Sequence, residues 1–127
     1  MIEGLFNQPC YVAAKKTLDA VAVRQEAIAN NIANLETPGY KRVDLAPNFR
    51  AELDRACSSG DPNQIAALKP SLAVDQTAVA NSPDGNTVSL ENEMMQLSEN
   101  TMTHTLETQM LSSMLMRLKM AITGKSS

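Results

Sequence analysis

"AIANNIANLETPGY", residues 27–40, joins an Ala- and Ile-rich helical pattern to three asparagines and an abrupt stop. Asparagine is a poor residue inside a helix, because its amide competes for nearby backbone groups. Pro38 biases the preceding residue away from the helical region, and Gly39 permits the positive φ of a sharp reversal. The stretch therefore predicts a helix end and a tight turn, with motif and turn residues Asn30, Asn31, Asn34, Thr37, Pro38, Gly39 and Tyr40.

The asparagines of this stretch have two interpretations. Asn30 and Asn34 share one helix face at i, i+4, while Ile28, Ile32 and Leu35 keep the other. An amide both donates and accepts hydrogen bonds, so these side chains are suited to locking the turn or bonding a neighbour's backbone. The alternative is an ordinary solvated Asn face before a common stop signal.

An apolar seam runs along the helix before the turn. Its positions alternate in steps of three and four, the spacing of the a and d positions of a heptad, and only Gln25 interrupts it. The seam consists of Tyr11, Ala14, Leu18, Val21, Gln25, Ile28, Ile32 and Leu35, of which Leu18, Val21, Ile28, Ile32 and Leu35 are the predicted packing residues. This pattern places an N-terminal helix and its turn within residues 1–41.

A second helix is predicted within residues 87–124, followed by a tail over 125–127. Residues 83–86, Pro-Asp-Gly-Asn, are turn chemistry, Ser89 or Thr87 is a candidate N-cap, and Gly124 supplies the stop. The predicted packing residues on the same three-four spacing are Leu90, Met94, Leu97, Leu111, Leu115, Leu118 and Ile122. Thr101, His104 and Thr108 form a polar belt in this seam, either a register-setting contact or an exposed stretch.

Residues 42–86 between the helices are interrupted repeatedly by proline and glycine and are mostly small and polar. Such a segment buries too little apolar surface to offset the entropy of ordering it. Leu45, Phe49 and Leu53 are spaced by four, which allows one short helix over 45–53. The sequence predicts a flexible, mostly irregular insert.

Composition and charge exclude several classes of protein. The 127 residues suit one domain, and the net charge of -3 argues against nucleic-acid binding, which depends on clustered Lys and Arg. No apolar run approaches the roughly 20 residues that span a bilayer, so no membrane insertion is expected. Glu3 stands where a signal peptide carries Lys or Arg. We therefore expect a cytosolic protein or one exported without a cleaved signal.

No pattern of catalytic or ligand-binding residues stands out. The chain has no Gly-rich phosphate loop and no nucleophile in a recognisable setting, and His104 is its single histidine. We expect no enzyme activity, no catalytic residues, no cofactor and no metal site. Cys10 and Cys57 sit in no CxxC spacing; either they form a disulfide or, as we favour, they are two unpaired thiols.

Two helices cannot enclose a core by themselves. A second apolar stripe beside the C-terminal seam consists of Met95, Met102, Leu106, Met110 and Met114. A helix with so wide an apolar surface needs more than one neighbour, and the alternative of a small closed bundle with Met as filler lacks a third and fourth helix. We predict an all-α protein in which the two long helices pair as a coiled-coil-like hairpin, within or between subunits, and pack with neighbouring subunits.

Two stretches resemble the bacterial flagellar axial proteins, the family of rod, hook and hook-associated subunits. "RQEAIANNIANLETPGYKRVDLAPNF", residues 24–49, resembles the N-terminal signature of the family. "NTVSLENEMMQLSENTMTHTLETQMLSSMLMRLKMAITG", residues 86–124, is similar to the C-terminal helix of the proximal rod members. The resemblance covers residues 12–53 and 86–124.

The resemblance implies a structural component of the flagellar basal-body rod, the hollow shaft that crosses the periplasmic space, transmits motor torque and passes exported axial proteins. The implied partners are other rod subunits, the proteins at the junction of the MS ring and the rod base, copies of the same chain and the flagellar type III export apparatus, which uses no cleavable signal peptide. Subunits of this family are partly disordered before they assemble. The alternatives are another rod protein of the family and, in a different class, a soluble helical export adaptor or chaperone.

Overall fold

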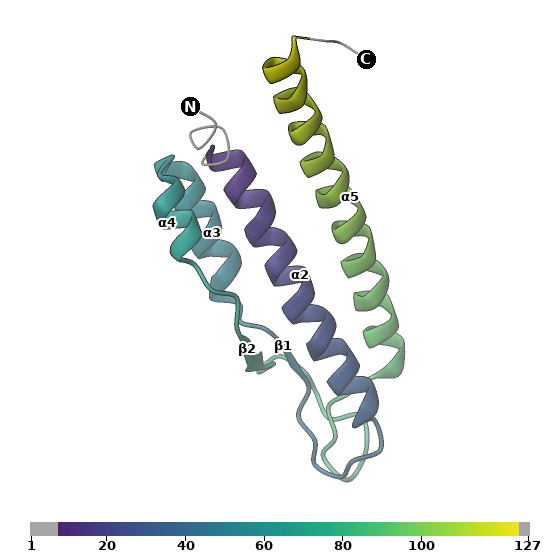
Figure 1. The fold of residues 1–127 in the computed structure, drawn as a ribbon. Coiled ribbons are helices and arrows are strands. Elements are labelled where there is room, and N and C mark those ends of the chain that lie inside the picture. Colours follow the sequence, from purple (N-terminus) through teal and green to yellow (C-terminus); the bar gives the residue numbers. More distant parts are fainter. Residues whose placement is uncertain (1–7, 125–127) are drawn as a thin grey trace.

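The computed structural model describes residues 8–124 and is mostly helical, as predicted. In chain order its elements are α2 (Pro9–Ala33), β1 (Val43–Leu45), α3 (Asn48–Ser59), α4 (Pro62–Ala67), β2 (Leu72–Val74) and α5 (Leu90–Thr123). The two long helices α2 and α5 lie side by side and run in opposite directions, and α3 and α4 lie on the other side of α2 (Figure 1). The predicted tail over 125–127 and the first seven residues lie outside the described part.

The ends of α2 follow from local chemistry. Pro9 stands at the first helical position, where its missing N–H is no loss. At the other end the N–H of Asn34 donates to the carbonyls of Asn30 and Asn31 at 3.1 and 3.2 Å. Gly39 then takes a φ of +71°, which confirms the sharp reversal predicted from the sequence.

The ends of α5 are capped by the residue types that the sequence offered. The hydroxyl of Ser89 accepts from the N–H of Asn92 at 3.4 Å, so Ser89 is the N-cap. The hydroxyl of Thr87, the other candidate, accepts instead from the N–H of Arg42 at 2.8 Å. At the C-terminal end Gly124 has a φ of +67° and donates its N–H to the carbonyl of Met120 at 2.8 Å.

The prediction of a mostly irregular segment over 42–86 is corrected for residues 43–74, which contain two short helices and two short strands, whereas residues 75–86 lie in no helix or strand. β1 and β2 pair antiparallel with Asp44 opposite Ala73, and the short helix α3 begins at Asn48 rather than at 45. Proline and glycine stand at helix ends in this segment. Gly60 ends α3 with a φ of +71°, and Pro62 begins α4. The protein is therefore mostly helical, with one short two-stranded sheet in its middle segment.

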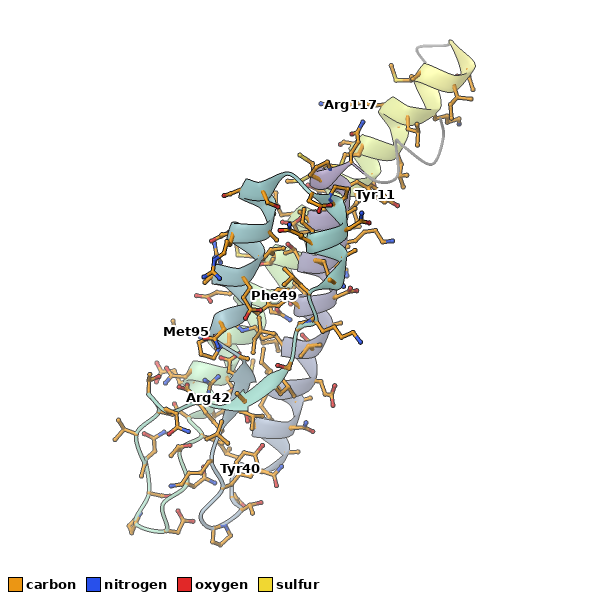
Figure 2. The ribbon with its side chains drawn as sticks, turned by 90° about the vertical axis from the view of Figure 1, so that its left-hand side faces the viewer. Tyr11, Tyr40, Arg42, Phe49, Met95 and Arg117 are labelled. Carbon is orange, nitrogen blue, oxygen red and sulfur yellow. The ribbon has the colours of Figure 1, made fainter. Side chains whose placement is uncertain are left out.

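The apolar core lies around α2, which packs against α5 on one side and against α3, α4 and β1 on the other. Small side chains on α2 let these neighbours approach, and Phe49 of α3 and Ile65 of α4, 5% and 0% exposed, close the second side (Figure 2). The buried apolar residues described are Ala14, Ala20, Val21, Ala27, Ile28, Phe49, Ala56, Ile65 and Val88. Ile65 shows that the middle segment contributes to the core.

The seam predicted on α5 is only partly the line that faces α2. Within the single chain Leu97, Leu111 and Leu118 are half-buried, whereas Leu90, Met94, Leu115 and Ile122 are exposed. The buried residues of α5 are polar, Glu93 and Asn100, so its contact line with α2 is offset from the predicted seam. On α2 Val21 and Ile28 are buried and Leu18, Ile32 and Leu35 are half-buried. A packing role for the exposed seam residues against neighbouring subunits stays a prediction.

Candidate functional site

Asn31 is the motif residue that the fold buries completely, with 0% of it exposed. Its side-chain amide donates to the carbonyl of Val43 at 2.8 Å and accepts from the N–H of Val43 at 2.9 Å. The same amide also donates to Oε2 of Glu93 at 3.2 Å. One side chain of α2 therefore holds both β1 and α5, which accounts for an asparagine so near the end of a helix.

Arg42 and Glu93 form a buried ion pair beside Asn31. The Arg42 side chain donates from Nε to Oε1 of Glu93 at 2.7 Å, and Glu93 is 0% exposed. A terminal nitrogen of Arg42 also donates to Asp75 at 2.5 Å and to Asp44 at 3.2 Å. We call Asn31, Arg42, Asp44, Asp75 and Glu93 the polar clamp, because together they join α2, both strands and α5.

A second arginine supports the polar clamp from α2. Arg24 donates to Oδ1 of Asp44 at 3.1 Å and also to the side-chain carbonyl of Gln96. Two cations thus face the three carboxylates of the clamp. A charge buried with good hydrogen bonds on every side is tolerated, whereas the same charge without a partner destabilises strongly.

The surroundings shift the pKa values of two members of the polar clamp, Arg42 and Asp75, and of its neighbour Tyr40. Burial of the Arg42 guanidinium lowers its pKa, but hydrogen bonds to Glu93 and Asp75 outweigh burial, and the pKa lies above its usual value. The pKa of Asp75 is lowered, mainly by the hydroxyl of Thr77 that donates to it at 2.6 Å and further by Arg42, although burial opposes this. Burial and the charge of Glu93 raise the pKa of Tyr40, whose hydroxyl donates to Asn31 at 3.3 Å.

Asn86 ties the turn before α5 to the end of α2. Its buried amide, 3% exposed, donates to the carbonyls of Asn34, Leu35 and Thr37 at 3.0, 3.0 and 2.8 Å. The side-chain carbonyl of Asn86 accepts from the N–H of Val88 at 2.8 Å. These contacts hold the turn before α5 against the segment that follows α2, where the carbonyls of Asn34 and Thr37 also accept the N–H groups of Thr37 and Tyr40 at 3.1 and 3.3 Å.

The two turns at this end also approach each other closely. A Cβ on Gly85, whose φ is +86°, would lie 4.0 Å from Cα of Gly39. Lys41 donates to the carbonyl of Gly85 at 2.8 Å. The clamp and these turns gather at one end of the molecule, with Tyr40 and Arg42, while Tyr11 and Arg117 lie at the other (Figure 2).

The structure distributes the predicted motif residues between a buried and an exposed set. Asn31 is buried, Asn34 and Tyr40 are half-buried, and Asn30, Thr37, Pro38 and Gly39 are exposed. Asn34 locks the turn, since its amide donates to the carbonyl of Asn30 at 2.8 Å and accepts from the hydroxyl of Thr37 at 3.1 Å. Whether the exposed members bond a neighbour's backbone stays a prediction.

Sequence reasoning missed Arg42, Asn86, Glu93 and Asn100 as fold-determining residues. Glu93 lies in the first turn of α5, where an acidic residue is common on any helix, and nothing local marks Arg42, whose partners Asp75 and Glu93 are distant in the sequence. Only the spacing of seven between Glu93 and Asn100, the two buried residues of α5, was available as a signal.

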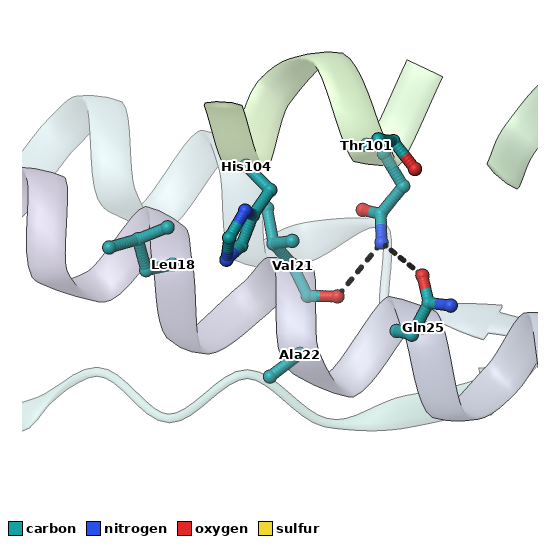
Figure 3. A pocket seen from close by; sticks show the side chains of 7 residues that line it. Leu18, Val21, Ala22, Gln25, Thr101 and His104 are labelled. Carbon is teal, nitrogen blue, oxygen red and sulfur yellow. Dashed lines mark hydrogen bonds between the residues drawn. The ribbon is translucent and has the colours of Figure 1, made fainter. Parts of the chain in front are cut away.

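Asn100 explains the one interruption of the seam on α2. Its amide donates to the carbonyl of Val21 at 3.0 Å and to the side-chain carbonyl of Gln25 at 3.1 Å (Figure 3). Thr101 and His104 line an open groove at the same level, and the predicted polar belt of Thr101, His104 and Thr108 is exposed. The belt is thus an exposed stretch in the single chain.

Metal-ligand clusters, membrane-spanning helices and disulfides are lacking among the residues that the structure describes. Among residues 8–124 no three His, Cys, Asp or Glu side chains come together as metal ligands, and none of the helices there combines the length and apolar character that a membrane crossing requires. Cys10 and Cys57 are exposed and not bonded to each other. Burial raises the pKa of the Cys57 thiol, and Asp54 and Cys10 raise it further.

Comparisons with known proteins agree with these observations. The family described as "Flagella basal body rod protein" matches residues 13–41, which end in the motif and its turn. The flagellar basal body rod protein FlgB of Borrelia hermsii is 32% identical over 113 residues, 75% of this chain and 82% of the relative. FlgB of Escherichia coli is 32% identical over 114 residues, 77% and 81% of the two chains, and FlgB of Cereibacter sphaeroides is 34% identical over 110 residues, 80% and 84%.

The long paired helices, the asparagine motif and its turn thus define a structural protein of the flagellar basal body rod, not an enzyme. Within that class the chain belongs to the FlgB family. The similarity to FlgB sequences favours this family over the two alternatives, another rod protein of the axial family and an export adaptor.

Proposed function

We propose that this chain joins other rod subunits and copies of itself to build the hollow shaft that transmits torque and passes exported axial proteins. The observation that carries this proposal is the apolar surface that α5 leaves open. The exposed large apolar residues of α5 are Leu90, Met94, Met95, Met102, Leu106, Met110, Leu115, Met116 and Ile122. So many exposed large apolar side chains on one helix are typical of a protein-protein contact.

The position in the cell follows from the same proposal. The chain takes its place in the periplasmic part of the rod, next to the proteins that join the rod base to the MS ring. It reaches that place through the flagellar type III export apparatus, a route without a cleavable signal peptide. The exposed seam residues of α5 and the exposed motif residues of α2 supply the contacts with these neighbours.

The test uses the bacterium that carries this chain. Deleting its gene should abolish flagella and swimming, and a plasmid copy should restore both. Mass spectrometry of purified basal bodies should find the chain as a fixed component, and cryo-electron microscopy should show its two long helices at the base of the rod. A chain that stays in the cytosol while the rod assembles normally would instead identify an export adaptor.

A further inference from the structure

Asp84 and Gly85 form the single Asp-Gly pair of the 127 residues, which contain no Asn-Gly pair. They lie in the turn that precedes α5, where Asp84 is exposed and Gly85 is half-buried. An aspartate followed by glycine cyclises readily, because glycine has no side chain to keep its backbone nitrogen away from the carboxyl carbon before it. The pair is therefore a candidate site of covalent modification outside the polar clamp.

The modification is a rearrangement that needs only water. The backbone nitrogen of Gly85 attacks Cγ of the protonated Asp84 side chain and gives up its proton, and the side-chain hydroxyl leaves as water. The product is a cyclic succinimide. Water then opens this ring: attack at Cγ restores aspartate, whereas attack at the former backbone carbonyl leaves the chain linked through Cγ as isoaspartate. One water leaves and one enters, so the composition of the chain is unchanged.

The folded turn keeps both reacting groups occupied. Oδ1 of Asp84 accepts from the N–H of Asn86 at 3.0 Å and from the hydroxyl of Ser82. The N–H of Gly85 donates to the carbonyl of Ser82 at 3.1 Å, so the attacking nitrogen is held in a hydrogen bond of its own. The hydrogen bonds from Ser82 and Asn86 also lower the pKa of Asp84, which makes the reactive protonated form scarce at neutral pH.

Isomerisation would disturb the groups that join this turn to the segment after α2. The backbone path through isoaspartate is one atom longer, and the former Asp84 carbonyl becomes a carboxylate. A Cβ on Gly39 would lie 3.9 Å from that carbonyl oxygen, so the new charge would stand against the turn after α2. Asn86 follows two residues later, and its buried amide donates to three carbonyls of that segment. A longer backbone moves this amide away from its acceptors.

We propose that Asp84–Gly85 is a site of isoaspartate formation, which the closed turn before α5 suppresses in the folded chain. The chain isomerises there when the turn opens, because the hydrogen bonds of Ser82 and Asn86 must break before the Gly85 nitrogen reaches Cγ. The product no longer closes the turn onto the segment after α2. The isoaspartate content at position 84 thus records how long a subunit has spent with this turn open.

Mass spectrometry of the full chain tests the site. The chain is incubated at neutral pH, with and without guanidinium chloride, in water enriched in heavy oxygen. Each passage through the succinimide adds one heavy oxygen, and electron-transfer fragmentation distinguishes isoaspartate from aspartate at position 84. We expect isoaspartate there in the denatured chain, and formation slower by roughly tenfold or more in the folded chain, because the opened fraction sets the rate.

The folded arm is measured on the isolated chain and on the chain in purified basal bodies, so that a loosely folded isolated subunit does not decide the result. Denatured chain without isoaspartate at position 84 would overturn the proposal. Formation as fast in both folded samples as in guanidinium chloride would overturn it too, since the turn would then give no protection. Neither result bears on the rod function.

Matched variants identify the contacts that keep the turn closed. Asn86→Ala removes the amide contacts but keeps the backbone N–H that Asp84 accepts, and it should accelerate isomerisation in native buffer towards the denatured rate. Asn63→Ala, at an exposed position on α4, should keep the rate of the parent. Asp84→Glu should give no product at position 84, because a longer side chain must close a larger ring, which forms far more slowly. An unchanged rate for Asn86→Ala would overturn the proposed link between turn opening and isomerisation.

The isomerised chain itself tests the consequence for the fold. Reversed-phase chromatography separates it from the parent chain, and thermal unfolding by circular dichroism compares the two after refolding. We expect a lower melting temperature for the isomerised chain, because the Asn86 amide no longer meets its three carbonyls. Equal melting temperatures would show that the turn closes equally well through isoaspartate, and would overturn this part of the proposal.

Discussion

Single polar residues, rather than apolar ones, fix how the two long helices of this protein meet. Asn31 and Glu93 are fully buried where a regular seam would carry Leu or Ile. Apolar side chains tolerate sliding of one helix along another, whereas a buried amide and carboxylate are satisfied in one register only. The Asn31 amide and the N–H and C=O of Val43 match in this way, so β1 sets the register as much as α5 does.

Removing the cation of the polar clamp should destabilise the isolated chain strongly. Arg42→Met leaves Glu93 buried without its partner, and breaking a buried pair in this way costs about 3–5 kcal/mol. The double variant Arg42→Met with Glu93→Met should recover part of that loss. Urea unfolding followed by circular dichroism measures both variants. Arg55→Met on the exposed surface of α3 is the control, and an equal effect of the two arginine changes would contradict a structural role for the clamp.

The acid Asp75 should make stability depend on pH. Its pKa is lowered in the folded chain, so its contribution is complete above the unfolded value near 3.9 and is lost as pH falls through the folded pKa. We expect Asp75→Asn to lower the free energy of unfolding by about 1 kcal/mol at pH 7. The difference from the parent should shrink between roughly pH 5 and pH 2.

Urea unfolding at several pH values checks this prediction. Asp54→Asn, at an exposed position on α3, serves as the matched control. A difference between Asp75→Asn and the parent that stays constant down to the lowest pH would show that the carboxylate charge of Asp75 does not contribute.

At the scale of elements, the C-terminal end of α2 depends on a residue far along the chain. Asn86→Ala removes three hydrogen bonds to the carbonyls of Asn34, Leu35 and Thr37, and because each bond contributes about 0.5–1.5 kcal/mol we expect the free energy of unfolding to fall by about 1–3 kcal/mol. Asn63→Ala, at an exposed position of α4, should change stability by no more than about 0.5 kcal/mol. Thermal unfolding by circular dichroism compares the two. Equal melting temperatures would show that water replaces the Asn86 contacts without loss.

A substitution at an exposed residue of the α5 seam separates two effects, one on the stability of the single subunit and one on the contact between subunits. Leu115 is 44% exposed, so Leu115→Asp should change the stability of the isolated chain by only about 1 kcal/mol. In the assembled rod the same charge would meet a neighbour at every subunit, and cells should not swim in soft agar. Ala51→Asp, at an exposed position on α3, should swim normally, with blots confirming equal amounts. If Leu115→Asp swims like the parent, the exposed seam is not a subunit contact.

The sequence was informative about elements and less so about their contacts. The periodicity and the capping residues Ser89 and Gly124 predicted both long helices, because these signals are local. The contact line on α5 was not predictable in the same way, since its buried members Glu93 and Asn100 are polar and a search for apolar periodicity passes over them. The polar clamp joins positions 31, 42, 44, 75 and 93, which come together only when the strands pair, and no spacing in the sequence records that.

At the scale of the whole molecule, burial is distributed unevenly along the two long helices. Buried polar residues cluster where α2, the strands and the start of α5 meet, and buried apolar residues follow α2 along its contact with α3 and α4, whereas no residue of α5 beyond Asn100 is buried in the part of the chain described. A lone helix is marginal in water and takes most of its stability from packing. The second half of α5 is therefore the part of the subunit whose order depends most on neighbours.

Amide hydrogen exchange of the isolated chain should reveal this gradient. We expect slow exchange in the second half of α2 and around Glu93, because opening there breaks the polar clamp, and fast exchange over 108–123. Arg42→Met should accelerate exchange in β1 and around Glu93 while leaving the already fast segment unchanged. Mass spectrometry of peptic fragments measures all these regions in one experiment. Uniformly slow exchange along α5 would contradict this view, because a helix that is stable without neighbours has no need of the contacts that its exposed apolar residues offer.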